Sequence, residues 1–238
     1  MSHKTARAAA VPKFGERRGE PKRSMANEFL QNIQLDETLY VDLLTKLIGE
    51  SERLQNNPHM GMLAQEDLAA QHVMDLLKPL SQEEGGPLKI EHLTYVEGRG
   101  NLIITYPGST DKTCGFVGSH LDVVPATPET WDFPPFELTR DGDKLRGRGT
   151  TDSLGHVAVV TAFMHALAIQ KPDLKVSVVA VFIASEEAES VPPNAGVESL
   201  VEQGKLEHLK QGPIFWIDCR YASMFALNCS PFALNCSP

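Results

Sequence analysis

The sequence has 238 residues, of which 42% are hydrophobic and 22% are charged, as is typical of a globular protein with one large domain or one domain plus part of another. The formal net charge is −9, and because residues 1–24 carry +5, the remainder carries −14. An acidic body argues against nucleic acid as a partner. The longest apolar run, residues 176–184, is far shorter than the ~20 residues that span a bilayer, so we expect no membrane partner either.

The two ends of the chain differ from its middle. Residues 1–24 are basic and Ala-rich without an apolar core, which argues against a secretory signal, while Glu16 and Glu20 argue against a transit peptide. We predict a disordered arm ahead of a natural start near Met25. The heptapeptide F-A-L-N-C-S-P occurs at residues 225–231 and again at 232–238. We interpret this tail as non-native, an artefact such as a frameshift, and assign residues 25–224 to one partial domain.

Cysteine usage predicts a reducing compartment. The four cysteines form no C-x-x-C pair and no disulfide framework, so we expect a cytoplasmic protein and no thiolate-held zinc. They are Cys114, Cys219, Cys229 and Cys236.

Helical periodicity is found in two segments before residue 80. Over residues 36–49 apolar residues recur at helical spacing, and Asp36 stands where an N-cap is expected. A second helix is predicted over about residues 65–77, because its Leu and Val residues fall on one side and Pro79 follows.

Strand signals dominate the remainder of the chain. We predict strands at residues 88–96, 101–106, 115–124, 174–184 and 213–217, a hairpin at 137–145 around D-G-D, and helices at 153–170 and about 196–203. Strands that alternate with helices predict an α/β fold with a mixed, mostly parallel sheet and helices on both faces. Sites in such folds lie at the carboxyl ends of the strands.

His120 and Asp122 follow a short apolar run. Side chains two apart on a strand share a face, so the carboxylate can hold one ring nitrogen while the other binds a metal. The alternative is a surface His–Asp pair at a strand end.

Three further acidic groups stand at similar positions. Asp152 follows G-R-G-T-T and can bridge two metal ions or cap the next helix. Glu186 and Glu187 follow an apolar strand, where one can bind metal and the other can accept a proton, or both can form a solvated acidic loop. Asp218 ends P-I-F-W-I-D. Together these termini predict a metal-dependent hydrolase with nitrogen and oxygen ligands. His156, one turn after Asp152, is expected to pack or cap.

The motifs G-S-H-L-D-V-V-P, R-G-R-G-T-T-D and V-V-A-V-F-I-A-S-E-E resemble those of the acetylornithine deacetylase/succinyl-diaminopimelate desuccinylase family of zinc metallohydrolases. T-T-D-S-L-G-H and the segment ending in P-I-F-W-I-D are similar to its eukaryotic acetylornithine deacetylase-like branch. The resemblance covers roughly residues 35–218. It implies the N-terminal part of a zinc-peptidase-like catalytic domain. It also implies the site roles: metal ligands His120, Asp152, Glu187 and Asp218, the general base Glu186, and the orienting residue Asp122.

The same resemblance implies the reaction and what lies beyond this chain. The substrate is a small N-acyl amino acid, foremost N-acetylornithine of arginine biosynthesis, and the cofactor is Zn²⁺ or alternatively Co²⁺, with two ions in an intact family site. The lid domain that mediates homodimer formation and a late His for the second metal are expected downstream, so we expect one ion and doubtful activity for this chain alone. A half-built sheet would leave an apolar edge strand exposed. A metallo-carboxypeptidase or dipeptidase, or a non-catalytic fragment, stays open as an alternative.

Overall fold

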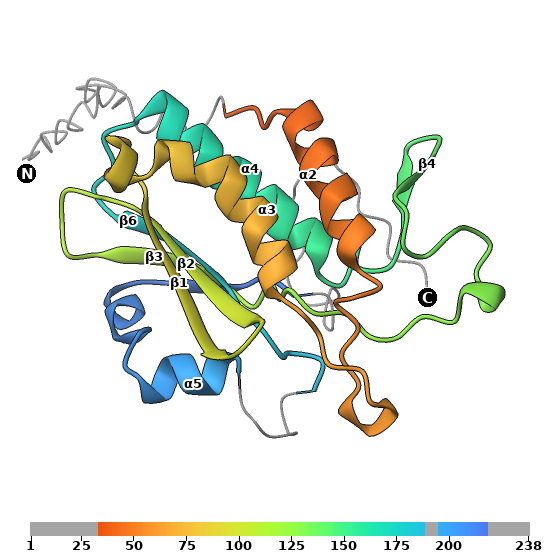
Figure 1. Cartoon of the computed structure of the whole chain (residues 1–238). Helices are drawn as coiled ribbons and strands as arrows, with labels where there is room; N and C mark the ends of the chain where they lie inside the picture. The colour runs from red at the N-terminus through yellow and green to blue at the C-terminus, as the bar shows by residue number, and fades with distance from the viewer. Residues whose placement is uncertain (1–32, 189–194, 219–238) are drawn as a thin grey trace, which may run out of the picture.

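The computed structural model describes residues 33–188 and 195–218 (Figure 1). The predicted basic arm, the duplicated tail and the domain limits at residues 25 and 224 lie outside the described residues.

A five-stranded sheet forms the centre of the molecule, in the order β1-β2-β6-β3-β7. Its strands are β1 (Lys89–Val96), β2 (Arg99–Tyr106), β3 (Thr113–Val117), β6 (Ser177–Phe182) and β7 (Ile214–Trp216). β2 is antiparallel to both of its neighbours, whereas β3 is parallel to β6 and to β7, so among the described strands only β2 runs against the common direction. The mixed, mostly parallel sheet predicted from the sequence is therefore confirmed.

Helices cover both faces of this sheet, as predicted (Figure 1). One face carries α2 (Glu37–Glu50), α3 (Asp67–Leu77) and α4 (Leu154–Gln170); the other carries α5 (Val197–Glu202) and the 3₁₀ helix Glu207–Gln211. The predicted cap is present, because the Asp36 carboxylate accepts from Leu39 N at 3.1 Å. Ten of the seventeen residues of α4 are buried, which agrees with its nearly uniform apolar composition.

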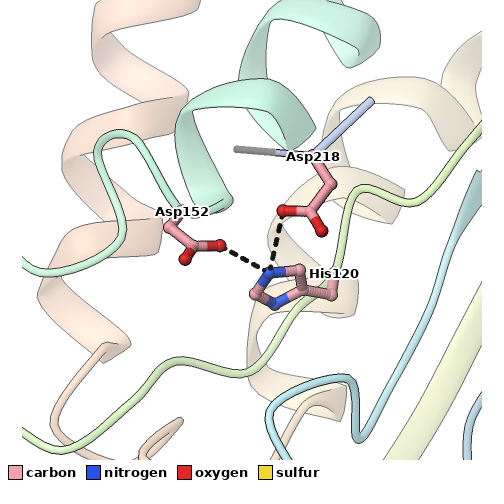
Figure 2. A group of neighbouring side chains, drawn as sticks. All are labelled: His120, Asp152 and Asp218. Carbon is pink, nitrogen blue, oxygen red and sulfur yellow. Dashed lines mark hydrogen bonds and ion pairs between the residues drawn. The ribbon is translucent and has the colours of Figure 1, made fainter. Parts of the chain in front are cut away.

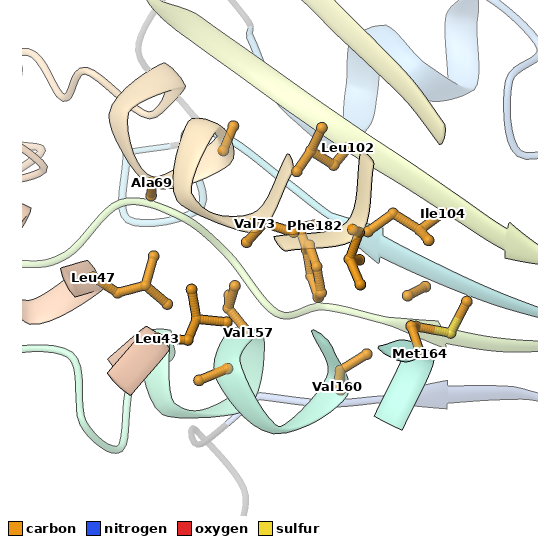
Figure 3. Packing of buried hydrophobic residues seen from close by; sticks show 14 of the residues in the cluster. Leu43, Leu47, Ala69, Val73, Leu102, Ile104, Val157, Val160, Met164 and Phe182 are labelled. Atoms are coloured by element: carbon orange, nitrogen blue, oxygen red, sulfur yellow. The ribbon is translucent and has the colours of Figure 1, made fainter. Parts of the chain in front are cut away.

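The core follows from the alternation of side chains along the strands. On β6, Val178, Ala180 and Phe182 face α2, α3 and α4, whereas Val179 and Val181 face α5. Leu102 and Ile104 of β2 join the first cluster, which Figure 3 shows between the sheet and the helices. This larger layer fixes the strands whose ends carry the polar residues.

The strand predicted over residues 115–124 is shorter than expected. β3 ends at Val117 because Gly118 has φ +103°, a conformation that side chains rarely adopt. A Cβ at Gly118 would lie 2.8 Å from the Trp216 ring, so the close approach of these two segments also requires glycine. His120 is joined to Ile183 only by an isolated bridge. The argument that His120 and Asp122 share a face of a regular strand is therefore wrong, although the two side chains do meet.

Other boundaries shift by a few residues. The predicted hairpin is formed by β4 (Thr139–Asp141) and β5 (Lys144–Arg146), and the predicted strand at 174–184 is regular only in β6. β7 is an edge strand of the described sheet, and its Ile214, Phe215 and Trp216 side chains are exposed. No helix in the described ranges is long and apolar enough to cross a membrane.

Candidate metal centre

The predicted site residues meet at one edge of the sheet. His120 follows β3, the two glutamates at 186 and 187 follow β6, and Asp218 follows β7, while Asp152 stands just before α4. Figure 2 shows Asp152 and Asp218 pointing at the His120 ring from two different elements. The parallel strands bring these segments together because their carboxyl ends lie at the same edge.

The His120 imidazole is fully buried and held at both nitrogens. Nδ1 lies 2.9 Å from the backbone oxygen of Asp122 and 3.3 Å from its Oδ1, while Nε2 lies 2.9 Å from Asp152 Oδ1. Burial disfavours a charged ring, but the bonds to Asp122 and Asp152 outweigh it, and the pKa of His120 is raised well above its ordinary value. Since Nδ1 faces only oxygen acceptors, it carries a proton and leaves Nε2 as the end that can bind a metal.

Asp122 binds the backbone of the segment that carries Glu186 and Glu187. Its Oδ2 accepts from Asn56 Nδ2 at 2.7 Å and from Glu187 N at 3.0 Å, and its Oδ1 accepts from Glu186 N at 3.1 Å. Burial would raise the pKa of Asp122, but the hydrogen bonds from His120 and Asn56 more than compensate and lower it. Asp122 is thus an ionised carboxylate that joins the imidazole to both glutamates. Asn56 was not singled out from the sequence, where N-N-P carries no functional signal.

Asp152 faces the imidazole, and the N-cap position of α4 is occupied by Ser153. The peptide bond between Asp152 and Ser153 is cis. Ser153 Oγ accepts from His120 N at 2.7 Å and donates to His120 O at 3.1 Å. The start of α4 is therefore fastened to the histidine segment.

The remaining carboxylates stand slightly farther from the ring. Glu186 Oε2 lies 3.9 Å and Asp218 Oδ1 4.0 Å from His120 Nε2, and both side chains are less than a tenth exposed. Burial raises the pKa of Glu187 to about 7; His120 opposes this rise, while Asp152 and the other neighbouring carboxylates add to it. One imidazole thus faces an excess of buried negative charge.

This donor set fits a divalent cation. Two groups have all their ligand atoms within 4.8 Å of one another: His120 with Asp152 and Asp218, and His120 with Glu186 and Glu187. Nitrogen and carboxylate oxygens are the ligands of Zn²⁺ and related ions, and a cation would offset the crowded negative charge. Both groups include His120, and its Nδ1 is bonded to Asp122. Among the described residues, Nε2 of His120 is therefore the one imidazole nitrogen that either group can offer to an ion.

The pKa values of two further side chains, His156 and Arg148, are influenced by the carboxylates of this site. Burial lowers the pKa of His156, whereas Asp218 and Asp152 act to raise it, so this histidine, predicted only to pack or cap, also neighbours the centre. Burial likewise lowers the pKa of Arg148, against the carboxylates of Glu187 and Asp152. Its guanidinium lies 4.8 Å from the Trp131 ring centroid. Sequence reasoning missed Arg148, and the glycines that flank it were the available signal.

Comparison with known proteins agrees with this geometry. A family profile described as peptidase family M20/M25/M40 matches residues 116–229. The chain is 58% identical over 186 residues to an acetylornithine deacetylase of Arabidopsis thaliana, covering 77% of this chain and 42% of that protein. It is 48% identical over 194 residues to the acetylornithine deacetylase of Dictyostelium discoideum, covering 78% and 43%. The chain therefore spans about two fifths of the length of these curated relatives.

Solved structures show the same fold at lower identity. Human carnosine dipeptidase 1 matches with a TM-score of 0.56 and 23% identity, over 82% of this chain and 41% of that one. The M20 family metallo-carboxypeptidase Sso-CP2 from Sulfolobus solfataricus matches with a TM-score of 0.55 and 21% identity, over 76% and 37%. These likenesses support the α/β fold and leave the choice of substrate to other observations.

Proposed function

Because the chain belongs to peptidase family M20/M25/M40, we propose that it is the part of a metal-dependent amidohydrolase that holds the metal and the general base. The observation that carries the proposal is the convergence of His120 with Asp152, Asp218 and two glutamates at the strand ends. N-acetylornithine is the proposed substrate, because the relatives at 58% and 48% identity are both acetylornithine deacetylases.

Zinc is the proposed ion, with cobalt as a substitute. His120, Asp152 and Asp218 would hold one ion tightly, which matches the three protein ligands of many catalytic zinc sites. Asp152 and Glu187 would contribute to a second position that lacks its own imidazole among the described residues, so we expect one tight ion per chain. When bound, such an ion acts as a Lewis acid that makes water more acidic and polarises an amide carbonyl.

Glu186 is the proposed general base. Its carboxylate lies beside His120 Nε2 and is almost fully buried, so it can take a proton from the attacking water and deliver it to the amine nitrogen as the C–N bond breaks. The products are a carboxylate and a free amine. Asp122 keeps the imidazole oriented and fixes the backbone of Glu186 and Glu187 throughout.

A dipeptidase or metallo-carboxypeptidase activity is the second candidate, and the likeness to carnosine dipeptidase 1 and Sso-CP2 is the observation in its favour. Both reactions cleave an amide with the same metal chemistry, so the described site serves either. Homodimer formation and a cytoplasmic location stay predictions.

The test is hydrolysis of N-acetylornithine by the zinc-loaded full-length protein, followed as release of the amine and compared with hydrolysis of simple dipeptides. Replacing Glu186 with Gln should lower kcat roughly 10²–10⁴-fold, the range for loss of a general base, and leave the zinc content equal to that of the unsubstituted full-length protein. Glu202→Gln makes the same chemical change on the exposed face of α5 and should leave kcat unchanged. Faster cleavage of dipeptides would favour the second candidate, and full activity of Glu186→Gln would refute the assignment of the base.

A further inference from the structure

The segment at residues 184–187, which carries both glutamates, is held through its backbone. Each of its four consecutive N–H groups donates to a buried side-chain oxygen. The acceptors are, in order, Asn101 Oδ1 at 2.9 Å, Glu66 Oε1 at 3.0 Å, and the two carboxylate oxygens of Asp122 at 3.1 and 3.0 Å. Because β6 ends at Phe182 and its ladder does not continue through this segment, these side chains set its path.

Glu66 is the member of this set that accepts the hydrogen bond from Ser185 N. It lies just before α3 and is fully buried, and Arg99 at the start of β2 grips it with two hydrogen bonds, Nη2 to Oε1 at 2.6 Å and Nε to Oε2 at 3.0 Å. This paired geometry fixes the direction of the carboxylate, because the planar guanidinium binds both oxygens at once. The Oε1 atom that receives Arg99 Nη2 also receives Ser185 N.

Ser185 is the residue that most needs such support. Its φ is +59°, in the left-handed region that residues other than glycine rarely adopt, and it is buried. A conformation of this kind persists where the surroundings determine it. It redirects the chain immediately after the strand, so that the carboxylates of Glu186 and Glu187 reach the His120 imidazole.

Stability alone does not account for a buried ion pair at this place. Two apolar side chains of similar size often serve the fold as well as a buried pair, since taking both charges out of water is costly. A directed acceptor for one backbone N–H is something that apolar side chains do not provide. We infer that Glu66 and Arg99 are positioning residues that hold Ser185 in its left-handed conformation and thereby aim Glu186 and Glu187 at the metal centre.

This inference rests on the proposed function, in which the two glutamates act as base and ligand. Two double variants of the full-length protein isolate the bond to Ser185. Glu66→Met with Arg99→Met removes both charges and the acceptor, whereas Glu66→Gln with Arg99→Met removes both charges but retains a side-chain oxygen for Ser185 N. Neither leaves a buried charge without its partner, so both are expected to fold.

Amide hydrogen exchange at residues 185–187 and zinc affinity are the two readouts. In the Met/Met variant we expect exchange to rise about tenfold, the equivalent of one buried hydrogen bond, and zinc affinity to fall roughly 10–100-fold, as for other groups that orient metal ligands. The Gln/Met variant should recover most of both. On a substrate that the protein cleaves, the Met/Met variant should lower kcat and leave KM nearly unchanged.

Two results would overturn the inference. One is wild-type exchange and zinc affinity in the Met/Met variant. The other is an equal loss in both variants, which would show that the charges support the fold and that the bond to Ser185 is unimportant. Because exchange and zinc affinity require no substrate, failure to cleave N-acetylornithine would refute the proposed function without touching these two measurements.

Discussion

The layer between the sheet and α2–α4 and the segment just beyond β6 are built in opposite ways. In the layer, the side chains of Phe182 and its neighbours are held mainly by apolar packing. Three residues later, Ser185 is held by a single directed hydrogen bond in an uncommon backbone conformation. Within three residues, the chain therefore passes from side chains that stabilise the fold to backbone that positions the site carboxylates. Substitutions on the two sides of this boundary should therefore have different consequences.

Phe182→Ala should give the largest loss of stability. The side chain is fully buried at the end of β6, so its removal leaves a cavity and should lower the free energy of unfolding by about 3–5 kcal/mol. Denaturant unfolding measures the loss, and zinc affinity of the protein that stays folded should change little. Leu63→Ala is the control, because this side chain is 63% exposed and should contribute only about 0.5 kcal/mol or less. A loss of zinc-binding free energy in folded Phe182→Ala that is larger than its loss of unfolding free energy would contradict the division between the two regions.

Asp122→Asn should have the reverse signature. The amide cannot accept at both positions where the carboxylate meets Glu186 N and Glu187 N, so we expect zinc affinity to fall about 10–100-fold. The change in the unfolding midpoint should be smaller than for Phe182→Ala. Asp141→Asn disturbs only the exposed ion pair with Arg146 and should leave zinc affinity intact. Equal zinc affinities for the two variants would contradict the orienting role of Asp122.

Zinc affinity should depend on pH more strongly than the stability of the apolar layer between the sheet and α2–α4. Hydrogen bonds to Asp122 and Asp152 raise the pKa of His120 well above its ordinary value against the effect of burial, so in the metal-free protein at neutral pH its ring holds a proton that a cation at the tight position must displace. Zinc affinity should fall by about tenfold for each pH unit below that raised pKa, and the pKa of Glu187, which burial raises to about 7, should add to the fall at the second position. Zinc titrations in buffers of different ionisation enthalpy give the number of protons released. Binding without proton release at pH 6 would contradict this account.

Periodicity was sufficient for most of the fold. The helices before residue 80 and the long apolar α4 were predicted because their side chains repeat at helical spacing or are nearly all apolar. The apolar run through His120 predicts a strand that is too long, because Gly118 has a positive φ and ends β3 within that run. Boundaries depend on single backbone conformations, which composition does not report.

The site was predictable to the extent that its residues stand at strand ends. His120, Glu186, Glu187 and Asp218 are predicted in this way and Asp152 from the glycine-rich turn before α4, and the structure brings all five together. The supporting residues were not found, because Asn56, Glu66 and Arg99 lie in segments distant along the chain and carry no motif of their own. Their role depends on tertiary contacts between elements, and only coordinates reveal those.

The contact between Gly118 and Trp216 has a consequence for the spacing of the His120 and Asp218 side chains. Gly118 stands two residues before His120, and Trp216 two residues before Asp218, so the indole against the bare main chain links the two segments that bring a nitrogen and an oxygen donor 4.0 Å apart. A methyl group at position 118 would push the edge strand outward and widen that span. The lack of a side chain at residue 118 thus helps to set the distance between two of the proposed metal ligands.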